Sequence, residues 1–167
     1  MKPRCKMKDE IRTAVEAWCK DRDAAKLQYG PIASWDTSEI TNMSSLFSNK
    51  VNFNGDISGW DVSSVLYMDG MLYGATSFNC DLSQWDVSNV TQMHSMLSGA
   101  TSFNCDLSQW DLSKVRYMSH MLAGATSFTH QLGGAWSTST ATKYGMFMNC
   151  PGGSIVGKTK QADGTIV

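Results

Sequence analysis

Apolar and polar positions alternate in a pattern that repeats every 25 residues along most of the chain. Each unit contains a Trp-Asp pair, and the tryptophans stand one period apart, at Trp35, Trp60, Trp85 and Trp110. Serine, valine or isoleucine, two methionines and phenylalanine recur at fixed offsets from them. A period of this length indicates that each unit is one supersecondary element, which buries its apolar face only by stacking on its neighbours. The sequence therefore predicts a solenoid.

Two segments of the unit have different apolar periods. Between Leu82 and Val87, the apolar residues Trp85 and Val87 alternate with polar ones, which is typical of a short strand with one buried face. Between Val90 and Ala100, apolar residues recur at helical spacing. We therefore expect a leucine-rich-repeat-like α/β coil with short parallel strands and short helices. An all-β solenoid with three short strands per coil is the alternative.

The repeat phase assigns most large apolar side chains to the core. The predicted core members are Trp35, Trp60, Trp85, Trp110, Met68, Met93, Met118, Phe78 and Phe103. Methionine is a flexible filler of irregular core space. A buried indole N–H requires an acceptor, and we expect carbonyl groups of the neighbouring coil, or serine side chains, to supply it.

Both ends of the array depart from the repeat, as the ends of a solenoid must. Residues 1–30 are expected to form an N-terminal capping helix, because Ile11, Val15 and Trp18 fall on one face at helical spacing. Residues 31–133 hold four 25-residue solenoid repeats. Residues 134–167 form a degenerate last coil and a C-terminal cap or tail, in which Trp136 comes 26 residues after Trp110. The three segments make a single domain.

Composition narrows the possible partners. The formal net charge is −1, and charged residues make up 17% of the chain, without the basic stripe of a nucleic-acid binder. No apolar run reaches the roughly 18 residues that a membrane span requires. Residues 1–6 are basic, but no apolar stretch follows them, so they do not read as a signal peptide. We expect no nucleic-acid partner and no membrane span, and the sequence leaves the location open.

The repeat also resembles a known family. The string W-D-V-S-N-V-T-x-M at 85–93, followed by M-L-x-G-A-x-S-F-N at 96–104, resembles the BspA-like leucine-rich surface-repeat family, which includes mycoplasma lipoproteins and algal surface proteins. The resemblance covers roughly residues 9 to 150 and implies a solenoid fold with surface or interaction roles. It implies a location at the cell surface or outside the cell, and it implies no catalytic residues.

We call the short segments that contain the Trp-Asp pair, such as residues 82–87, the Trp segments. Their polar positions form the candidate binding surface. Its members are Asp36, Asp61, Gln84, Asp86, Gln109 and Asp111. Stacked strands would place the carboxylates about 4.8 Å apart on an exposed face. Each carboxylate could close a local turn with its own serine, meet a basic partner, or bind calcium. Calcium needs six to eight converging oxygen ligands, and the sequence has no D-x-D-x-D-G loop, so we expect no metal site and no cofactor.

Three further sets of polar residues have simpler interpretations. Asn54, Asn79 and Asn104 recur with the period and are expected to bond the backbone of neighbouring coils. Cys80 and Cys105 stand one period apart, so a disulfide is geometrically possible, although a reducing compartment would keep both thiols free. The three histidines, His94, His120 and His130, share no repeat phase, and we expect them to be unrelated surface residues.

These observations favour a non-enzymatic protein-interaction module or a structural subunit of a larger assembly. Extended repeated faces are the surfaces with which solenoids bind their partners. The partner is expected to be a protein that meets the polar face of the Trp segments. The alternative is a surface module that binds carbohydrate, a small ligand or a cation.

Overall fold

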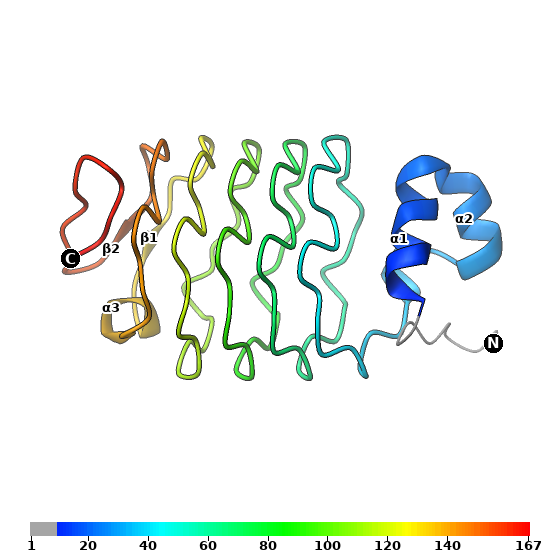
Figure 1. Cartoon of the computed structure of the whole chain (residues 1–167), viewed down its shortest axis with the longest axis horizontal. Helices are drawn as coiled ribbons and strands as arrows, with labels where there is room; N and C mark the ends of the chain where they lie inside the picture. Colours follow the sequence, from blue (N-terminus) through cyan, green and yellow to red (C-terminus); the bar gives the residue numbers. More distant parts are fainter. Residues whose placement is uncertain (1–9) are drawn as a thin grey trace.

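A computed structural model describes residues 10–167. Residues 1–9, which include Cys5 and the basic stretch discussed above, lie outside the described part. The elements are α1 (Ile11–Lys20), α2 (Arg22–Tyr29), a 3-10 helix η1 (Ile32–Ser34), β1 (Gln131–Leu132), α3 (Ala135–Thr138) and β2 (Ser154–Ile155). Between η1 and β1 the chain winds through successive coils that lie side by side. Helices α1 and α2 stand at one end of this stack, and β1, α3 and β2 stand at the other (Figure 1).

The N-terminal cap consists of two helices instead of the single helix expected from the sequence. The break lies at Asp21, whose backbone is extended, with φ −148° and ψ 96°. The Asp21 carboxylate accepts the N–H of Ala24 at 3.0 Å, which is the N-cap interaction that begins a new helix. The apolar face of α1 buries Ile11, Val15 and Trp18, the three residues whose spacing predicted it.

One residue of each coil forms a parallel bridge to the equivalent residue of the next coil. The bridges make a ladder through Asn42, Tyr67, Gln92, Tyr117 and Thr142. Beyond each bridge, alternate N–H groups donate to the next coil. Met93 donates to the carbonyl of Tyr117 at 2.8 Å, and Leu97 donates to that of Met121 at 2.9 Å. The stack is therefore held together by backbone hydrogen bonds as well as by its core.

The local structure of the coil differs from the expected strand and helix. The segment from Val90 to Ala100 is a run of turns, because its N–H groups bond to the neighbouring coil and not to the carbonyl four residues earlier. The segment from Leu82 to Val87 is not a strand, because the N–H of Trp85 turns back to the Leu82 carbonyl at 3.1 Å. The bridge ladder thus lies in the segment expected to be helical.

Left-handed residues at two positions per coil explain why no helix forms there. In one coil these residues are Ser95 (φ 53°) and Gly99 (φ 74°). The equivalent residues with positive φ are Ser45, Gly70, His120 and Gly145 at the first position, and Asn49, Gly74, Gly124 and Asn149 at the second. A right-handed helix cannot pass through either position. Glycine and asparagine tolerate this conformation better than other residues do.

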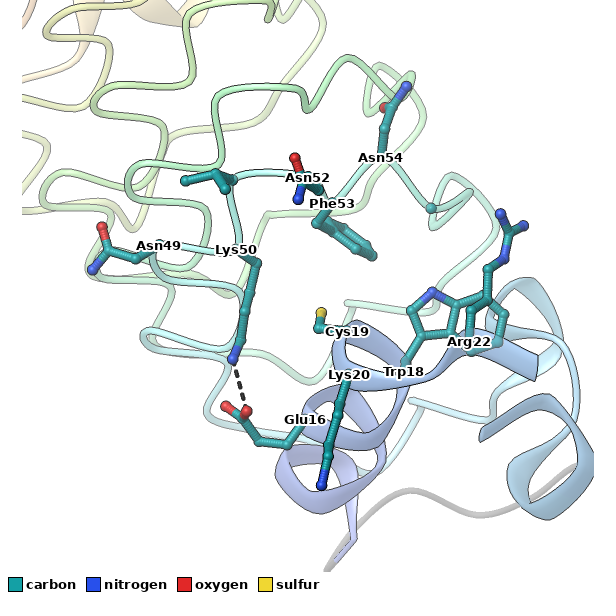
Figure 2. A pocket seen from close by; sticks show the side chains of 12 residues that line it. Glu16, Trp18, Cys19, Lys20, Arg22, Asn49, Lys50, Asn52, Phe53 and Asn54 are labelled. Carbon is teal, nitrogen blue, oxygen red and sulfur yellow. Dashed lines mark hydrogen bonds and ion pairs between the residues drawn. The ribbon is translucent and has the colours of Figure 1, made fainter. Parts of the chain in front are cut away.

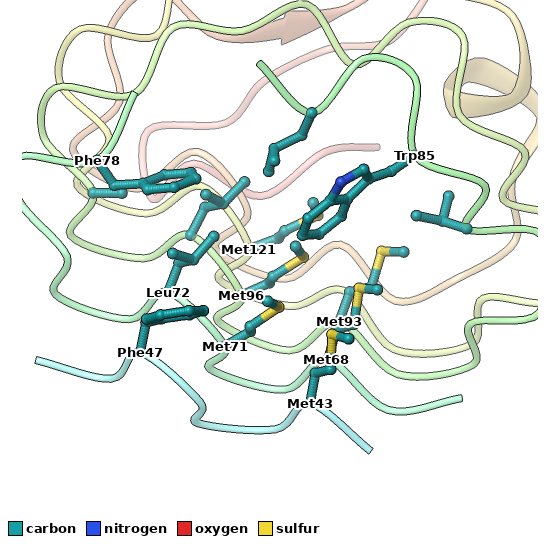
Figure 3. Close-up of a cluster of buried hydrophobic side chains, with 14 of the residues drawn as sticks. Met43, Phe47, Met68, Met71, Leu72, Phe78, Trp85, Met93, Met96 and Met121 are labelled. Carbon is teal, nitrogen blue, oxygen red and sulfur yellow. The ribbon is translucent and has the colours of Figure 1, made fainter. Parts of the chain in front are cut away.

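The nine side chains predicted as core are all buried, with exposed fractions between 0% and 4%. They stack in columns through the coils. Figure 3 shows Met43, Met68 and Met93 in one such column. In another column, the rings of Phe78 and Phe103 lie 6.1 Å apart and almost parallel.

The repeated tryptophans also bond to the preceding coil. The indole N–H groups of Trp60, Trp85 and Trp110 donate to the carbonyls of Ile32, Ile57 and Leu82 at 2.9, 3.1 and 3.0 Å. Trp136 does the same to Leu107 at 2.8 Å, although it comes one residue late in the period. The expected source of the indole acceptors, the carbonyls of a neighbouring coil, is therefore confirmed.

At the C-terminal end the core column of methionines stops at a lysine. The Lys143 ammonium is buried and donates to the carbonyls of Ser139 and Ala141 at 2.5 and 3.2 Å. Burial lowers the pKa of this ammonium, and the nearby Lys158 lowers it further. A polar group at this point marks the place where methionine stacking ends.

The C-terminal tail covers the last coil. β2 pairs with β1 in parallel, with Gln131 opposite Ser154. The N–H of Phe147 donates to the carbonyl of Gly164 at 2.9 Å, so a residue of the tail takes the place of a further coil. Lys160 holds the intervening loop, because its ammonium donates to three carbonyls between Cys150 and Gly153 at 2.8 to 3.0 Å.

Replacing Trp85 with alanine is expected to lower the free energy of unfolding by about 3–5 kcal/mol, because it empties a buried site in the middle of the stack. It also leaves the Ile57 carbonyl without its indole donor. Denaturant-induced unfolding measures the loss. The control Trp85→Phe keeps a ring and should cost less than the alanine variant. An unchanged unfolding midpoint for Trp85→Ala would contradict the core assignment.

Replacing Gly99 with alanine is expected to destabilise the protein by about 1–2 kcal/mol, the cost of a left-handed backbone at a residue that carries a Cβ. The added Cβ would also meet the Gly74 Cα at 3.5 Å. Gly59→Ala is the matched control, because its Cβ would have no heavy atom within 4 Å and its φ is not positive. Equal thermal unfolding midpoints for the two variants would argue against backbone strain at Gly99.

Candidate binding faces and an end pocket

The aspartates of the Trp segments lie side by side on one surface, which we call the Asp face. It is formed by residues 56–61, 81–86 and 106–111 of three successive coils. The predicted binding residues Asp61, Gln84, Asp86, Gln109 and Asp111 are exposed on it, and Asp36, one coil earlier, is half-buried. Asp56, Asp81 and Asp106 form a second exposed column beside the predicted one. The aspartates of this second column are not among the predicted binding residues.

Both Asp columns close local turns. The Asp86 carboxylate accepts the Ser88 N–H at 3.1 Å, and the Asp61 carboxylate accepts both the N–H and the hydroxyl of Ser63 at 3.0 and 2.6 Å. The Ser88 hydroxyl and then its N–H lower the pKa of Asp86. One oxygen of each carboxylate is thus used locally, as in an Asx turn, and the second oxygen faces solvent.

The second column has the same arrangement and the same electrostatic consequence. Asp56 accepts from the hydroxyl and N–H of Ser58, which lower its pKa. The Ser83 N–H, followed by the Cys105 thiol, lowers the pKa of Asp81. These carboxylates are therefore ionised at neutral pH.

The middle coils hold no lysine or arginine, and Lys114, which follows them in the chain, attracts the Asp86 carboxylate and lowers its pKa less than Ser88 does. Residues 51–113 contain seven aspartates and no lysine, arginine or glutamate. Six of the seven belong to the Asp face, and Asp69 lies elsewhere in its coil. The Asp face therefore carries a concentrated negative charge, although the whole chain is almost neutral.

The asparagine column has the structural role expected for it. Asn79 and Asn104 each donate their backbone N–H to the side-chain oxygen of the asparagine one coil earlier, both at 2.9 Å. Thr129 continues the column by donating to Asn104 at 3.0 Å. These side chains link adjacent coils where the chain turns, and they contribute to stacking.

The two period-related cysteines do not form a disulfide. Cys80 and Cys105 are free, as are Cys19 and Cys150 among the residues from 10 to 167. The Cys105 thiol lies 3.1 Å from the Asp81 carboxylate. Burial raises the pKa of Cys105 to about 11, so this thiol is protonated at neutral pH and is a poor nucleophile.

A second surface follows the bridge ladder, and we call it the ladder face. Tyr67, Tyr117 and Tyr144 are 38%, 52% and 61% exposed on it. The rings of His94 and His120 meet edge to face at 5.8 Å, and His120 meets Tyr144 in the same way at 5.3 Å. The expectation of unrelated histidines is therefore wrong for this pair, because an offset of one coil and one residue brings the two rings together.

A pocket lies between the first coil and the helical cap, where α1 ends and α2 begins, and we call it the end pocket. Its volume is about 540 Å³. Figure 2 shows Trp18, Cys19 and Arg22 on its helical side and Lys50, Phe53 and Asn54 on its coil side. Lys50 closes one edge through an ion pair with Glu16 at 2.7 Å. Sequence reasoning missed this pocket, because no periodic pattern encodes the spacing between a cap and a coil.

Two further results concern the part of the chain from residue 10 to residue 167. It contains no group of three or more His, Cys, Asp or Glu side chains placed to hold a metal ion. None of its helices has the length and apolar character needed to cross a membrane.

Comparison with known proteins identifies the family. A family model described as "Mycoplasma protein of unknown function, DUF285" matches residues 20–136, which are most of the repeat array. The chain belongs to this family. No curated protein and no solved structure matches it. The DUF285 match begins inside α1 and ends at Trp136, so it covers part of the N-terminal cap and every coil that carries the Asp face.

The carboxylates of Asp56, Asp81 and Asp106 should make the stability of this DUF285 chain depend on pH. Their folded pKa values lie below the unfolded ones, so their contribution is complete above about pH 4. It is lost as the pH falls through the folded pKa values. We expect the unfolding midpoint to fall on acidification in this range.

A variant with all three residues changed to asparagine separates this effect from general acid unfolding. Its side-chain oxygens can accept the same serine N–H groups without titrating. Its unfolding midpoint should therefore fall less than that of the unmodified chain over the same acidic range. Equal losses in the two proteins would show that these three carboxylates do not carry the pH dependence.

Proposed function

We propose that this chain is a non-enzymatic interaction module that binds a basic segment of a partner protein through the Asp face. The observation that carries the proposal is the charge of the middle coils, with seven aspartates and no lysine or arginine in residues 51–113. Carboxylates on adjacent coils repel one another. A basic partner would reduce this repulsion, and the reduction would favour its binding.

The arrangement of the Asp face supports an extended partner. Aspartates of three coils recur at the spacing of the stack, and each has one oxygen fixed in a turn by a serine N–H. The carboxylates are thus oriented before any partner arrives, which lowers the entropic cost of binding. Charge complementarity would chiefly speed association and make it dependent on salt.

We further propose that the stacked coils form a solenoid of the kind used by the BspA-like surface-repeat proteins, with a role at the cell surface or in a larger assembly. The W-D-x-S-x-V-x-x-M repeat supports this closer relationship. The continuous bridge ladder favours the all-β geometry over the leucine-rich α/β plan. Repeated extended surfaces are the binding surfaces of such arrays.

Affinity capture with three forms of the purified chain tests the proposed function. The first is the unmodified chain, and the second carries Asp61→Asn, Asp86→Asn and Asp111→Asn. The third is a control with the same change in charge away from the Asp face, at three exposed acidic residues: Glu10→Gln, Asp23→Asn and Asp163→Asn.

Proteins bound through the Asp face should be retained by the unmodified chain and by the control, but lost from the Asp-face variant. Raising the salt concentration should release them, because the attraction is between exposed charges. Retention of the same proteins by all three forms would exclude the Asp face as the binding surface.

Carbohydrate binding by the ladder face is the second candidate. The exposed rings of Tyr67 and Tyr117, which stand two coils apart in the same repeat phase, favour it. Tyr67→Ala combined with Tyr117→Ala should abolish binding to any glycan that the unmodified chain retains on a glycan array. The Asp-face variant should bind that glycan normally, so the two candidate functions are separated by the same proteins.

A further inference from the structure

One tryptophan of the chain differs from the other five in its hydrogen bonding. Trp35, Trp60, Trp85, Trp110 and Trp136 all donate their indole N–H to a backbone carbonyl. Trp18 is only 6% exposed, yet its indole N–H has no acceptor among the described residues. No fully buried side-chain nitrogen of the described chain lacks a partner, so this N–H retains some exposure, and Trp18 lines the end pocket (Figure 2).

Two residues of the first coil that line this pocket, Asn52 and Asn54, also have backbone N–H groups without an acceptor among the described residues. In the next coil, the N–H groups of Ser77 and Asn79 donate back to Val51 and Asn54. The equivalent N–H groups of the first coil belong to Asn52 and Asn54, and no described residue accepts from them. A preceding coil would supply the acceptors, but the end pocket occupies that position.

The first coil departs from the repeat where it lines the pocket. The position of Lys50 is held by a fully buried alanine in the three following coils, Ala75, Ala100 and Ala125. Asn52 likewise replaces a serine of those coils. Lys50 thus brings a cation where the later coils have a methyl group, and Asn52 brings an amide where they have a hydroxyl. Both substitutions lie in the pocket lining.

The charge of the pocket is positive. Lys20, Arg22 and Lys50 line it together with a single acidic residue, Glu16. Glu16 is paired with Lys50, whereas Lys20 and Arg22 form no ion pair within residues 10–167. The Arg22 guanidinium lies over the Trp18 ring, 5.3 Å from its centre.

From this geometry we propose that the end pocket binds a small organic anion, with Trp18 in its wall and the charges of Lys20 and Arg22 at opposite sides of its rim as recognition groups. A carboxylate or phosphate group can accept from an N–H donor that has no acceptor among residues 10–167 and can also pair with cations that have no ion-pair partner there. The rings of Trp18 and Phe53 offer apolar surface to the body of the ligand. The volume of about 540 Å³ falls within the range of small-molecule sites.

The pocket lining ends at Gly55, next to Asp56 of the Asp face, but its cations come from the cap and the first coil. The two sites would bind groups of opposite charge, so the pocket goes beyond the proposed function and does not depend on it. The Asp face would bind a cationic partner through exposed carboxylates of the middle coils. The end pocket would bind an anion between the N-terminal cap and the first coil. Either site can exist without the other.

Two-dimensional NMR of the indole N–H signals tests the proposal. The Trp18 signal is identified by its absence from the Trp18→Phe variant. Benzoate and phenyl phosphate are the anionic probes, and benzamide is the neutral probe of matched shape. We expect at least one anion to shift the Trp18 signal in a saturable way and benzamide to leave it in place.

Two variants with the same change in charge locate the effect. Lys20→Gln with Arg22→Gln removes the two pocket cations other than Lys50, and Arg12→Gln with Lys26→Gln removes two exposed cations outside the pocket lining. The first pair should weaken anion binding about tenfold or more, and the second should leave it nearly unchanged.

Several results would overturn the proposal. They are no saturable shift with either anion, an equal shift with benzamide, or equal weakening by the two pairs of substitutions. A response to one anion and not the other would support the site and assign its preference to carboxylate or to phosphate. Each variant is first shown to unfold at the midpoint of the unmodified chain, so that a lost signal is not a lost fold.

Discussion

The backbone of each coil depends on its neighbours for hydrogen bonds. Alternate N–H groups after each bridge residue donate to the next coil, as Met93 does to Tyr117 and Leu97 to Met121. A buried backbone group left without a partner costs free energy comparable to a lost hydrogen bond, so a single coil cannot be stable alone. The side chains follow the same rule, since each indole of the repeat reaches a carbonyl of the preceding coil.

This dependence explains residue choices that hydrophobicity alone does not. After each bridge residue, backbone N–H groups donate alternately to the next coil and to a carbonyl of their own coil. This alternation requires left-handed residues within each coil, and these positions hold glycine, asparagine, serine or histidine. The turns of the Trp segments need a carboxylate that accepts the N–H two residues later, which an exposed aspartate provides without leaving solvent. The Asp face is thus a by-product of turn formation, and it is also the surface on which negative charge accumulates.

Features that follow from the 25-residue period could be predicted from the sequence. Contacts between residues at different positions of the repeat could not. The burial of Trp85 and Met93 and the need for indole acceptors come from the period alone. The helix expected after Val90 was wrong, because spacing of three and four residues also fits a chain of turns in which Ser95 and Gly99 are left-handed. The period contains no information on φ, apart from the recurring glycine.

The end pocket was missed for a different reason. Its walls come from α1 and the first coil, two elements that are not related by the repeat. A signal was nevertheless present in the sequence, because Lys50 stands in the phase of three alanines. Comparison of each repeat position across all coils, including the imperfect ones, would have identified it. Sequence departures at the end of an array are therefore as informative as the consensus.

The terminal coils at both ends of the stack lack a further coil to accept their N–H groups, and the two ends differ in what replaces it. At the C-terminal end, the tail supplies the acceptor for the Phe147 N–H, and the Lys160 ammonium binds three carbonyls of the adjoining loop. At the N-terminal end, α1 covers the apolar core, and the N–H groups of Asn52 and Asn54 have no acceptor among residues 10–167. A helix has no free edge that could pair with a coil, because its own N–H and carbonyl groups bond internally. A coil capped by a helix therefore lacks the acceptors that a further coil would supply, and the same place holds Lys20, Arg22 and the Trp18 indole, none of which has an ion pair or an N–H acceptor within the described part of the chain.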